Sequence, residues 1–380
     1  MTEQAKVPAI RFAGFTDPWE QRKLGELTES YSGGTPAAGE SEFYGGSIPF
    51  IRSAEIAAES TELFLTEKGY ESSSARMVKP GDVLYALYGA TSGEVAVSRQ
   101  KGAINQAILA ILPRDDCDAR YITAWLRKQK GYIVTTYLQG GQGNLSGVIV
   151  KNLEVSIPSL PEQQKIGFML SHLDSLITLH QRKYDKLVIF KKSMLEKMFP
   201  KDGESVPEIR FAGFTDPWEQ RKFSEIVDVC SGRDYKHLDE GPIPVYGTGG
   251  YMTSVSEALS HNRDAIGIGR KGTIDKPYLL KAPFWTVDTL FYAIPKSDIN
   301  LEFALCSFLN VDWKSKDEST GLPSLSKESI NETVLSVPNV VEQNHLGNFF
   351  ADLDRLITLH QRKLELLQNI KKSLLDKMFA

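Results

Sequence analysis

The sequence predicts an α+β fold built from two α/β domains with mixed β-sheets and two long helices that pair as a coiled coil. Three observations predict it. The 14-residue stretch IRFAGFTDPWEQRK occurs at 10–23 and again, unchanged, at 209–222. A 39-residue stretch at 161–199 aligns without gaps to 341–379, with 21 identities that include an unbroken LITLHQRK. The segments between the repeats differ from each other and alternate short apolar runs with Gly-rich turns.

The repeats divide the chain of 380 residues into one plan used twice. The predicted parts are an N-terminal arm (1–23), a first variable domain (24–160), a first long helix (161–199), a linker with the second arm (200–222), a second variable domain (223–340) and a second long helix (341–380). The first arm would follow the second helix if the chain closed into a ring. This pseudo-two-fold cyclic plan predicts that Met1 and Ala380 lie close together, at the place equivalent to the 200–208 linker.

The two long repeats have the pattern of coiled-coil helices. Ser159 with Glu162, and Asn339 with Glu342, match the capping box that starts a helix. Apolar residues then recur at spacings of 3 and 4 over five heptads, and each helix should be about 55 Å long. The predicted seam residues are Leu173, Ile177, His180 and Leu187 on the first helix, and Leu353, Ile357, His360 and Leu367 on the second.

The seam histidines His180 and His360 occupy equivalent positions, which is compatible with either a metal site or a polar position that sets the helix register. We favour the register and predict no metal site. Each variable domain contains one helix candidate, at 119–130 and at 301–309. The expected strand-rich runs lie at 47–56, 81–98, 103–113, 243–253, 265–280 and 284–295.

Composition favours a protein of the cytoplasm. Cys117, Cys230 and Cys306 are odd in number and form no CxxC pair, which is typical of a reducing compartment and argues against a disulfide framework or a zinc site. No run of 18 apolar residues and no signal-like N-terminus is present, so we expect no membrane association. The net charge is −4. A DNA-binding surface on this chain would therefore consist of local basic patches or depend on a partner.

Motifs for catalysis are absent from the sequence. It contains no phosphate-binding loop, no HExxH, no GxSxG and no Asn-Pro-Pro-aromatic motif. Gly267, Gly269 and Gly272 match the dinucleotide fingerprint GxGxxG, but Pro277 follows and no apolar helix begins there. We therefore predict a binding protein without catalytic residues rather than an enzyme.

Gly-rich loops in both variable domains combine cationic, amide and hydroxyl side chains. Arg and Lys recognise guanine edges, Asn and Gln recognise adenine edges, and Ser and Thr contact bases or phosphates. Each single residue is equally compatible with a solvated loop, but the set on both domains favours a nucleic-acid surface. The candidates are Thr35, Arg52, Tyr88, Thr91, Ser92, Arg99, Lys101, Asn105, Gln106, Tyr246, Thr248, Arg263, Arg270, Lys271, Thr273 and Lys276.

Over its whole length, the chain resembles the specificity subunit of a type I restriction–modification enzyme. The resemblance rests on the repeated arm, the PEQQ helix start at 161–164, SGGTP at 32–36 and the repeated LITLHQRK. Departures are Val341 and Asn344 at the start of the second helix, and SGRDY at 231–235 in place of SGGTP. The resemblance implies two target-recognition domains that each read half of a bipartite DNA sequence. It also implies antiparallel long helices that set the half-site spacing.

The resemblance further implies partners and their cofactors. Two adenine methyltransferase subunits would dock on this chain, and restriction/translocase subunits would join for cleavage. S-adenosylmethionine, ATP and Mg²⁺ would be bound by those partners, and this chain would bind no cofactor itself. Two alternatives stay open at this point: a coiled-coil scaffold that presents two protein-binding domains and never touches DNA, and an enzyme in its own right.

Overall fold

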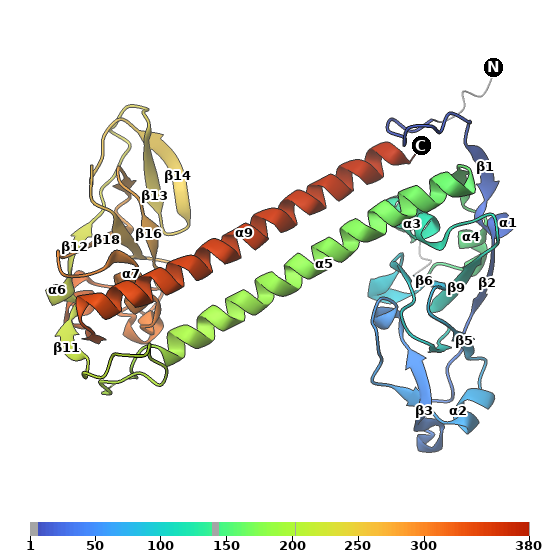
Figure 1. The fold of residues 1–380 in the computed structure, drawn as a ribbon, viewed down its shortest axis with the longest axis horizontal. Helices are drawn as coiled ribbons and strands as arrows, with labels where there is room; N and C mark the ends of the chain where they lie inside the picture. Colours follow the sequence, from blue (N-terminus) through green and yellow to red (C-terminus); the bar gives the residue numbers. More distant parts are fainter. Residues whose placement is uncertain (1–6, 139–143, 202, 380) are drawn as a thin grey trace. The chain divides into compact units, whose positions relative to one another are not determined.

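The computed structural model describes residues 7–138, 144–201 and 203–379, and the chain divides into two compact units (Figure 1). The first unit comprises Met1–His180 and Lys363–Ala380, and the second comprises Gln181–Arg362. Each unit therefore contains one arm, one variable domain and part of each long helix. Within the described residues, no helix is long and apolar enough to cross a membrane.

The two long helices are α5 (Leu160–Lys197) and α9 (Val340–Met378). Each starts one residue before the predicted position and ends two residues before the predicted end. The eight predicted seam residues are buried or half-buried, whereas Thr178 and Arg355 between them are exposed. The predicted stripe is therefore the face of each helix that is shielded from water.

Within each unit, α5 and α9 run antiparallel. In the first unit, Asp174 near the start of α5 forms an ion pair with Lys371 near the end of α9. In the second unit, Lys191 near the end of α5 binds both carboxylate oxygens of Asp354, at 2.6 and 2.7 Å. In the aligned repeats, Asp174 corresponds to Asp354 and Lys191 to Lys371. The same pair therefore forms twice, with the aspartate on α5 in one unit and on α9 in the other. Because only one register satisfies both carboxylates, the Asp–Lys pairs specify the alignment of the helices.

The strands of the first unit are β1 (Glu20–Lys23), β2 (Thr28–Ser32), β3 (Tyr44–Ile51), β4 (Phe64–Leu65), β5 (Arg76–Val78), β6 (Val83–Ala86), β7 (Val95–Val97), β8 (Gly102–Ile104), β9 (Ile108–Pro113) and β10 (Glu154–Ile157). An antiparallel sheet has the order β2-β9-β6-β7, a second sheet has the order β4-β3-β8-β5, and β1 pairs with β10. Strands β3 and β8 are parallel, so the second sheet is mixed, as predicted.

The second unit repeats this topology with a different periphery. Its strands are β11 (Glu219–Lys222), β12 (Val227–Ser231), β13 (Ile243–Gly247), β14 (Gly250–Val255), β15 (Ala265–Gly269), β16 (Tyr278–Leu280), β17 (Trp285–Thr286), β18 (Leu290–Pro295) and β19 (Val334–Val337). The sheets are β12-β18-β15-β16, a mixed β14-β13-β17, and β11 paired with β19. Strand β14 pairs antiparallel with β13 as β4 does with β3, whereas β5 has no counterpart among the described strands of this unit.

The shorter helices are α1 (Leu24–Leu27), α2 (Glu67–Glu71), α3 (Ala119–Leu138) and α4 (Gly147–Lys151) in the first unit, and α6 (Phe223–Ile226), α7 (Leu301–Leu309) and α8 (Lys327–Glu332) in the second. Helix α7 has the predicted bounds. Helix α3 extends beyond its predicted end at Lys130, through Gly131. Burial of Ile133 in the core offsets the cost of a helical glycine, which is about 1 kcal/mol.

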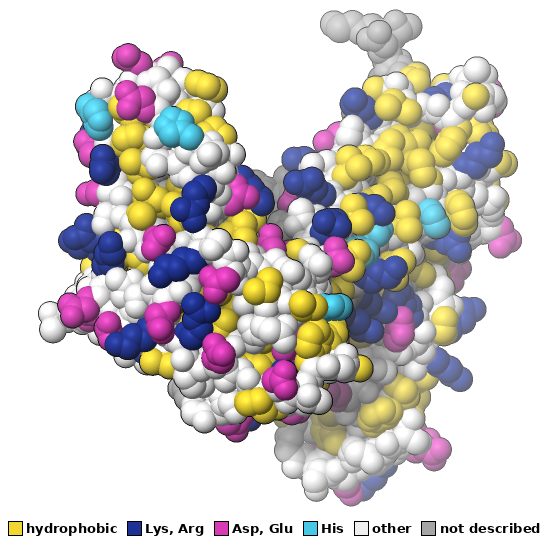
Figure 2. Space-filling model, turned by 60° about the vertical axis from the view of Figure 1, so that its left-hand side comes forward, with side chains coloured by type: hydrophobic (Ala, Val, Ile, Leu, Met, Phe, Trp, Pro, Cys, Tyr) yellow, Lys and Arg dark blue, Asp and Glu magenta, His cyan; other side chains and the backbone are white. Residues whose placement is uncertain are grey.

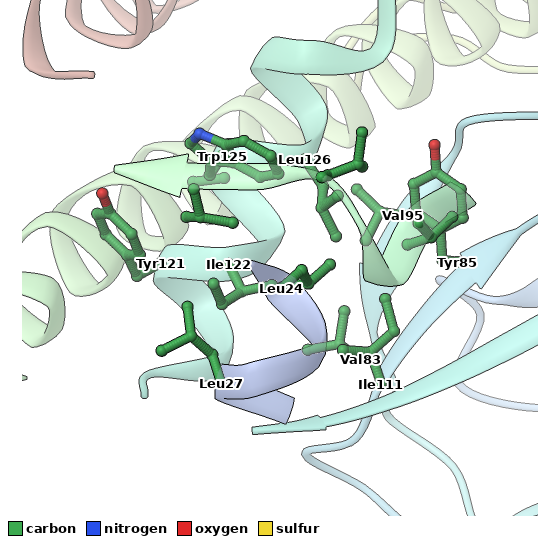
Figure 3. Close-up of a cluster of buried hydrophobic side chains, with 14 of the residues drawn as sticks. Leu24, Leu27, Val83, Tyr85, Val95, Ile111, Tyr121, Ile122, Trp125 and Leu126 are labelled. Atoms are coloured by element: carbon green, nitrogen blue, oxygen red, sulfur yellow. The ribbon is translucent and has the colours of Figure 1, made fainter. Parts of the chain in front are cut away.

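The main core of the first unit lies between α3 and the β2-β9-β6-β7 sheet (Figure 3). Tyr121, Ile122 and Leu126 of α3 are fully buried in one cluster with Val83 and Ile111 of the sheet. Burying one such side chain contributes roughly 1.5–3 kcal/mol. The core of the second unit is richer in aromatic rings, and it includes Phe223, Phe308 and Trp313 in mutual contact.

The repeated arms bind the starts of the long helices in the same way. Arg11 donates to both carboxylate oxygens of Glu162 at 2.9 and 2.7 Å, and Arg210 donates to both oxygens of Glu342 at 2.7 and 2.8 Å. Both Glu side chains are 1% exposed. The carboxylate in each case raises the pKa of the arginine it binds, through the hydrogen bonds. The glutamates of the predicted capping boxes therefore anchor the arms.

Each arm also meets the end of a long helix. The Ile10 N–H donates to the carbonyl of Lys377 at 3.0 Å, and the Ile209 N–H donates to the carbonyl of Lys197 at 2.9 Å. The first arm, near the start of the described chain, thus contacts the end of α9. The second arm contacts the end of α5 in the same way. Met1 and Ala380, predicted to be close together, lie outside the described residues.

Candidate nucleic-acid interface

A pair of loops in the second unit gathers several of the predicted DNA-binding residues. The loop between β15 and β16 pairs with the segment that precedes α8, through a bridge between Lys271 and Ser324. The Leu325 N–H donates to the carbonyl of Arg270 at 3.0 Å, and the Gly272 N–H donates to that of Pro323 at 2.8 Å. The two segments therefore form one surface, which we call the second loop pair (270–273 with 323–326).

Asp317 holds the chain that leads into the second loop pair. Its carboxylate accepts hydrogen bonds from the backbone N–H groups of Ser319 and Ser324, both at 2.9 Å, and from the Ser319 hydroxyl at 2.8 Å. Hydrogen bonds from the two backbone groups lower the pKa of Asp317. The carboxylate is thus charged at neutral pH and fixes the turn that presents Ser324.

The first unit contains the same arrangement between β6 and β7, where Tyr88 bridges to Asn144. The Leu145 N–H donates to the carbonyl of Leu87 at 3.0 Å, as Leu325 does to Arg270. We call residues 87–91 with 144–146 the first loop pair. Residues 139–143 lie outside the described residues.

Each loop pair contains a glycine with a positive φ directly after its bridging residue. Gly89 has a φ of 71° and Gly272 a φ of 86°, a conformation that side chains with a Cβ rarely adopt. The two loop pairs therefore have similar backbone conformations, whereas their side chains differ. Tyr88 and Asn144 occupy the positions that Lys271 and Ser324 occupy in the second unit.

The second loop pair borders a basic pocket. Arg270, Lys271 and Lys327 line it together with Phe291 and Glu318. The Arg270 guanidinium carbon lies 5.7 Å from the centre of the Phe291 ring, and no acidic side chain among the described residues forms an ion pair with this guanidinium. On the face seen in Figure 2, Lys and Arg side chains are interspersed with Asp and Glu over the second unit. Local basic pockets therefore provide the positive potential.

The other predicted residues of the first unit have varied surroundings. Thr35 and Gln106 are hydrogen-bonded to each other at 2.5 Å and are both exposed. Arg52 is paired with Glu55, and Arg99 with Glu59. Three polar side chains instead bind backbone: Ser92 is buried and donates to Leu87, Thr91 donates to Tyr88, and Asn105 accepts from Ala107.

Strand geometry separates some of the predicted residues from the loop pairs. Arg99 and Lys101 follow β7, so they lie at the opposite end of that strand from Thr91. Arg263 precedes β15 and donates to the carbonyl of Pro295 at 2.7 Å, at the opposite end of that strand from Arg270. Lys101 is exposed and, within the described part of the chain, has no ion-pair partner.

The remaining candidates of the second unit lie on the β13–β14 hairpin and around β16. The half-buried Tyr246 ring contacts Tyr251 and Tyr278, at 6.4 and 6.3 Å between ring centres. Thr248 and Thr273 are half-buried, and Lys276 is exposed. The dinucleotide-like Gly267 and Gly269 lie within β15, which turns into β16 and not into a helix.

Sequence reasoning missed the second half of each loop pair. Asn144, Ser324 and Lys327 were not among the candidates. Their signal was the turn-rich composition of 140–144 (GGQGN) and 319–324 (STGLPS), directly before a short helix. In the described residues, no group of three or more His, Cys, Asp or Glu side chains is placed to hold a metal ion. The seam residues His180 and His360 are half-buried.

Comparison with known proteins matches both halves of the chain to one family. The model of the type I restriction modification DNA specificity domain matches residues 16–188 and again 215–369. The type I restriction enzyme MjaVIII specificity subunit of Methanocaldococcus jannaschii is 21% identical over 402 residues, covering 95% of this chain and 92% of that protein. The MjaIX specificity subunit of the same organism is 29% identical over 233 residues, covering 56% of this chain and 52% of that protein.

A solved structure has the same fold. The type I restriction–modification S subunit from M. genitalium aligns with a TM-score of 0.68 over 99% of both chains, at 19% identity. The α+β fold with two mixed-sheet domains, predicted from the repeats, is confirmed. With two matches of the family model, one for each unit's variable domain, the chain belongs to the type I restriction–modification DNA specificity family.

Proposed function

We propose that this chain, as a non-catalytic specificity subunit, reads an asymmetric bipartite DNA target, with one half-site for each loop pair. The observation that carries the proposal is that the two loop pairs have similar backbone conformations but different side chains. Gly89 and Gly272 have similar backbone conformations. The positions occupied by Tyr88 and Asn144 in the first loop pair are occupied by Lys271 and Ser324 in the second. Different donors and acceptors read different bases, so the two half-sites should differ in sequence.

The proposal includes docking of two methyltransferase subunits on the long helices. Equivalent apolar side chains are exposed in both units: Leu179 and Ile370 in the first, and Leu359 and Phe190 in the second, each between 39% and 46% exposed. A helix face with exposed apolar residues is typical of a protein-binding surface. Two alike surfaces fit two alike partners. S-adenosylmethionine, ATP and Mg²⁺ would then belong to the methyltransferase and restriction/translocase partners.

Methylome sequencing of the host tests the function. We expect adenine methylation at a split, asymmetric sequence in cells that express the chain with its methyltransferase, and loss of that methylation when the chain alone is deleted. Deletion that leaves every methylated motif unchanged would support the protein scaffold instead, because a scaffold that never touches DNA selects no sequence.

Lengthening the helices tests whether they set the half-site spacing. Seven residues inserted after both Arg182 and Arg362 add about 10 Å to each helix and preserve the heptad register. Since B-DNA rises 3.4 Å per base pair, we expect the spacer of the methylated motif to grow by about 3 base pairs with both half-sites unchanged. The same methylome measurement reads the result, and an altered half-site would contradict the spacing role.

The matched control for this experiment is the insertion after Arg182 alone. It displaces one helix against the other, so the ion pairs Asp174–Lys371 and Lys191–Asp354 cannot both form. We expect this single insertion to lower the stability of the pair and to reduce methylation at every spacer length.

A further inference from the structure

A basic pocket in the first unit lies away from the loop pairs. Its volume is about 160 Å³, and it is formed by α3, the β7 hairpin and parts of both long helices that belong to this unit. Four basic side chains line it: Arg99, Arg120, Arg127 and Lys371. Thr123, Ser171 and Ser175 also border it, and their hydroxyls donate to backbone carbonyls of their own helices.

The acidic groups at this pocket do not balance its cations. Asp174 accepts from Arg127 at 2.5 Å and also pairs with Lys371, so two cations share one carboxylate. Arg99 pairs with Glu59 at 3.1 Å, and both of these side chains are more than half exposed. The Arg120 guanidinium has no acidic partner within the described chain. Four cations against two carboxylates leave an excess of two positive charges.

The second unit shows that the repeat architecture does not require these arginines. Asp118 accepts from Tyr121 N–H and donates its own N–H to Gln163, and Asn300 makes the same two contacts with Phe303 and Gln343. This correspondence aligns α3 with α7 residue by residue.

The alignment places Glu302 at the position of Arg120 and Leu309 at that of Arg127. Burial raises the pKa of Glu302, and Asp354 and Asp264 act on it in the same direction. The equivalent place thus carries an acidic side chain instead of the Arg120 cation, and a neutral one instead of Arg127. The positive pocket is a property of the first unit alone, although Lys191 and Asp354 repeat the Asp174–Lys371 pair.

We infer that this pocket binds a phosphate group of the DNA backbone next to the half-site read by the first loop pair. The inference rests on the proposed function. Planar guanidinium groups are the donors that suit a phosphate diester, and the excess positive charge matches its negative charge. Arg99 belongs to the hairpin that carries Thr91 at its other end, eight residues away, so the two lie at most about 26 Å apart. A duplex presents a phosphate on each strand every 3.4 Å of its axis, so one bound at the loop pair has phosphates within that reach.

Salt-dependent DNA binding by the full chain tests the pocket. A random-sequence duplex is titrated at several salt concentrations, because phosphate contacts do not depend on sequence. We expect Arg120→Ala and Lys371→Ala each to weaken binding and to make the slope of log K against log[salt] shallower by about 0.9. Arg120→Glu, which introduces the residue of the second unit, should weaken binding further.

Lys191→Ala is the matched control, because Lys191 occupies the same repeat position as Lys371 and binds the equivalent aspartate. It removes the same charge from the chain but none from the pocket, so the wild-type slope is expected. Equal slopes for wild type, Arg120→Ala and Lys371→Ala would overturn the inference, and so would an equal change in Lys191→Ala. Wild-type protein that binds no duplex at all would overturn the proposed DNA contact itself.

Inorganic phosphate distinguishes a DNA contact from a site for a free anion. At constant ionic strength, phosphate in the micromolar range should not displace the duplex from the wild-type chain. Displacement that requires Arg120 would identify a free-anion site and contradict the backbone contact.

Discussion

Arg11→Ala is expected to lower the free energy of unfolding of the first unit by about 3–5 kcal/mol. The substitution leaves the Glu162 carboxylate buried, with a side chain 1% exposed, and removes both of the hydrogen bonds that Arg11 donates to it. A buried charge without a partner is far more costly than the loss of an exposed ion pair, which is worth at most about 1 kcal/mol. The arm joins the end of one long helix to the start of the other, so the loss should affect the whole junction.

Hydrogen exchange followed by mass spectrometry measures this effect in each unit separately. In Arg11→Ala, we expect faster exchange at the start of α5 and in α3, with the second unit unchanged. Arg210→Ala is the matched variant, and it should accelerate exchange at the start of α9 and in α7 only.

Two further variants separate the buried charge from other effects of the substitution. Arg11→Lys keeps the charge but loses the two-pronged geometry, so a smaller loss is expected. Adding Glu162→Gln to Arg11→Ala removes the uncompensated charge and should restore part of the stability. A loss below about 1 kcal/mol in Arg11→Ala would show that water reaches Glu162 and would contradict the buried pair.

Gly272→Val is expected to reduce affinity for a duplex that carries the methylated target by about 5- to 150-fold. Gly272 has a φ of 86° and no atom within 4 Å of an added Cβ, so the effect arises from the backbone and not from a clash. A β-branched residue held in this conformation costs about 1–3 kcal/mol, and 1.4 kcal/mol corresponds to a factor of ten. The loop should relax to a different path and move Lys271 away from Ser324.

The same substitution at Gly89, with a φ of 71°, provides the complementary test. Binding to duplexes with substitutions in one half-site or the other would show which half each variant has stopped reading. We expect Gly272→Val and Gly89→Val to lose discrimination at opposite half-sites. Loss at the same half-site in both variants would contradict the assignment of one loop pair to each half.

Gly81→Val controls for backbone strain. Gly81 has a φ of 99° and open space at its Cβ, but it precedes β6 and therefore lies at the far end of that strand from Gly89. This variant should lose stability comparable to that of Gly89→Val while keeping both half-site preferences.

Local pattern was enough to predict most elements of the fold. The seam of α5 and α9 repeats at spacings of 3 and 4, and one period of this kind can be satisfied only by a helix with a single buried face. Helix α7 has the predicted bounds because Asn300 caps it, with its side chain accepting from the Phe303 N–H. Helix α3 was predicted too short because Gly131 is a stop signal only when nothing beyond it is buried, and Ile133 is buried.

The candidate site was predicted only in part, because its halves are distant in sequence. Tyr88 and Asn144, or Lys271 and Ser324, meet only after the sheet and the short helices α4 and α8 have formed. Arg99 and Thr91 are both candidates for DNA contact and are close in sequence, but the intervening strand β7 places them at its opposite ends. The roles predicted for these residues in DNA contact stay predictions.

The sequence by itself determined the doubled plan, the two long helices and the family, because repeats and heptads are patterns of residues that are close together in the chain. Only the tertiary structure decided that Glu162 and Glu342 anchor the arms, that Asp–Lys pairs align the helices, and that the two loop pairs have similar backbone conformations. These contacts join residues that are distant in sequence, such as Arg11 and Glu162, which are separated by 151 positions. Burial makes such a pair strong, and burial is a property of the folded chain that no local pattern contains.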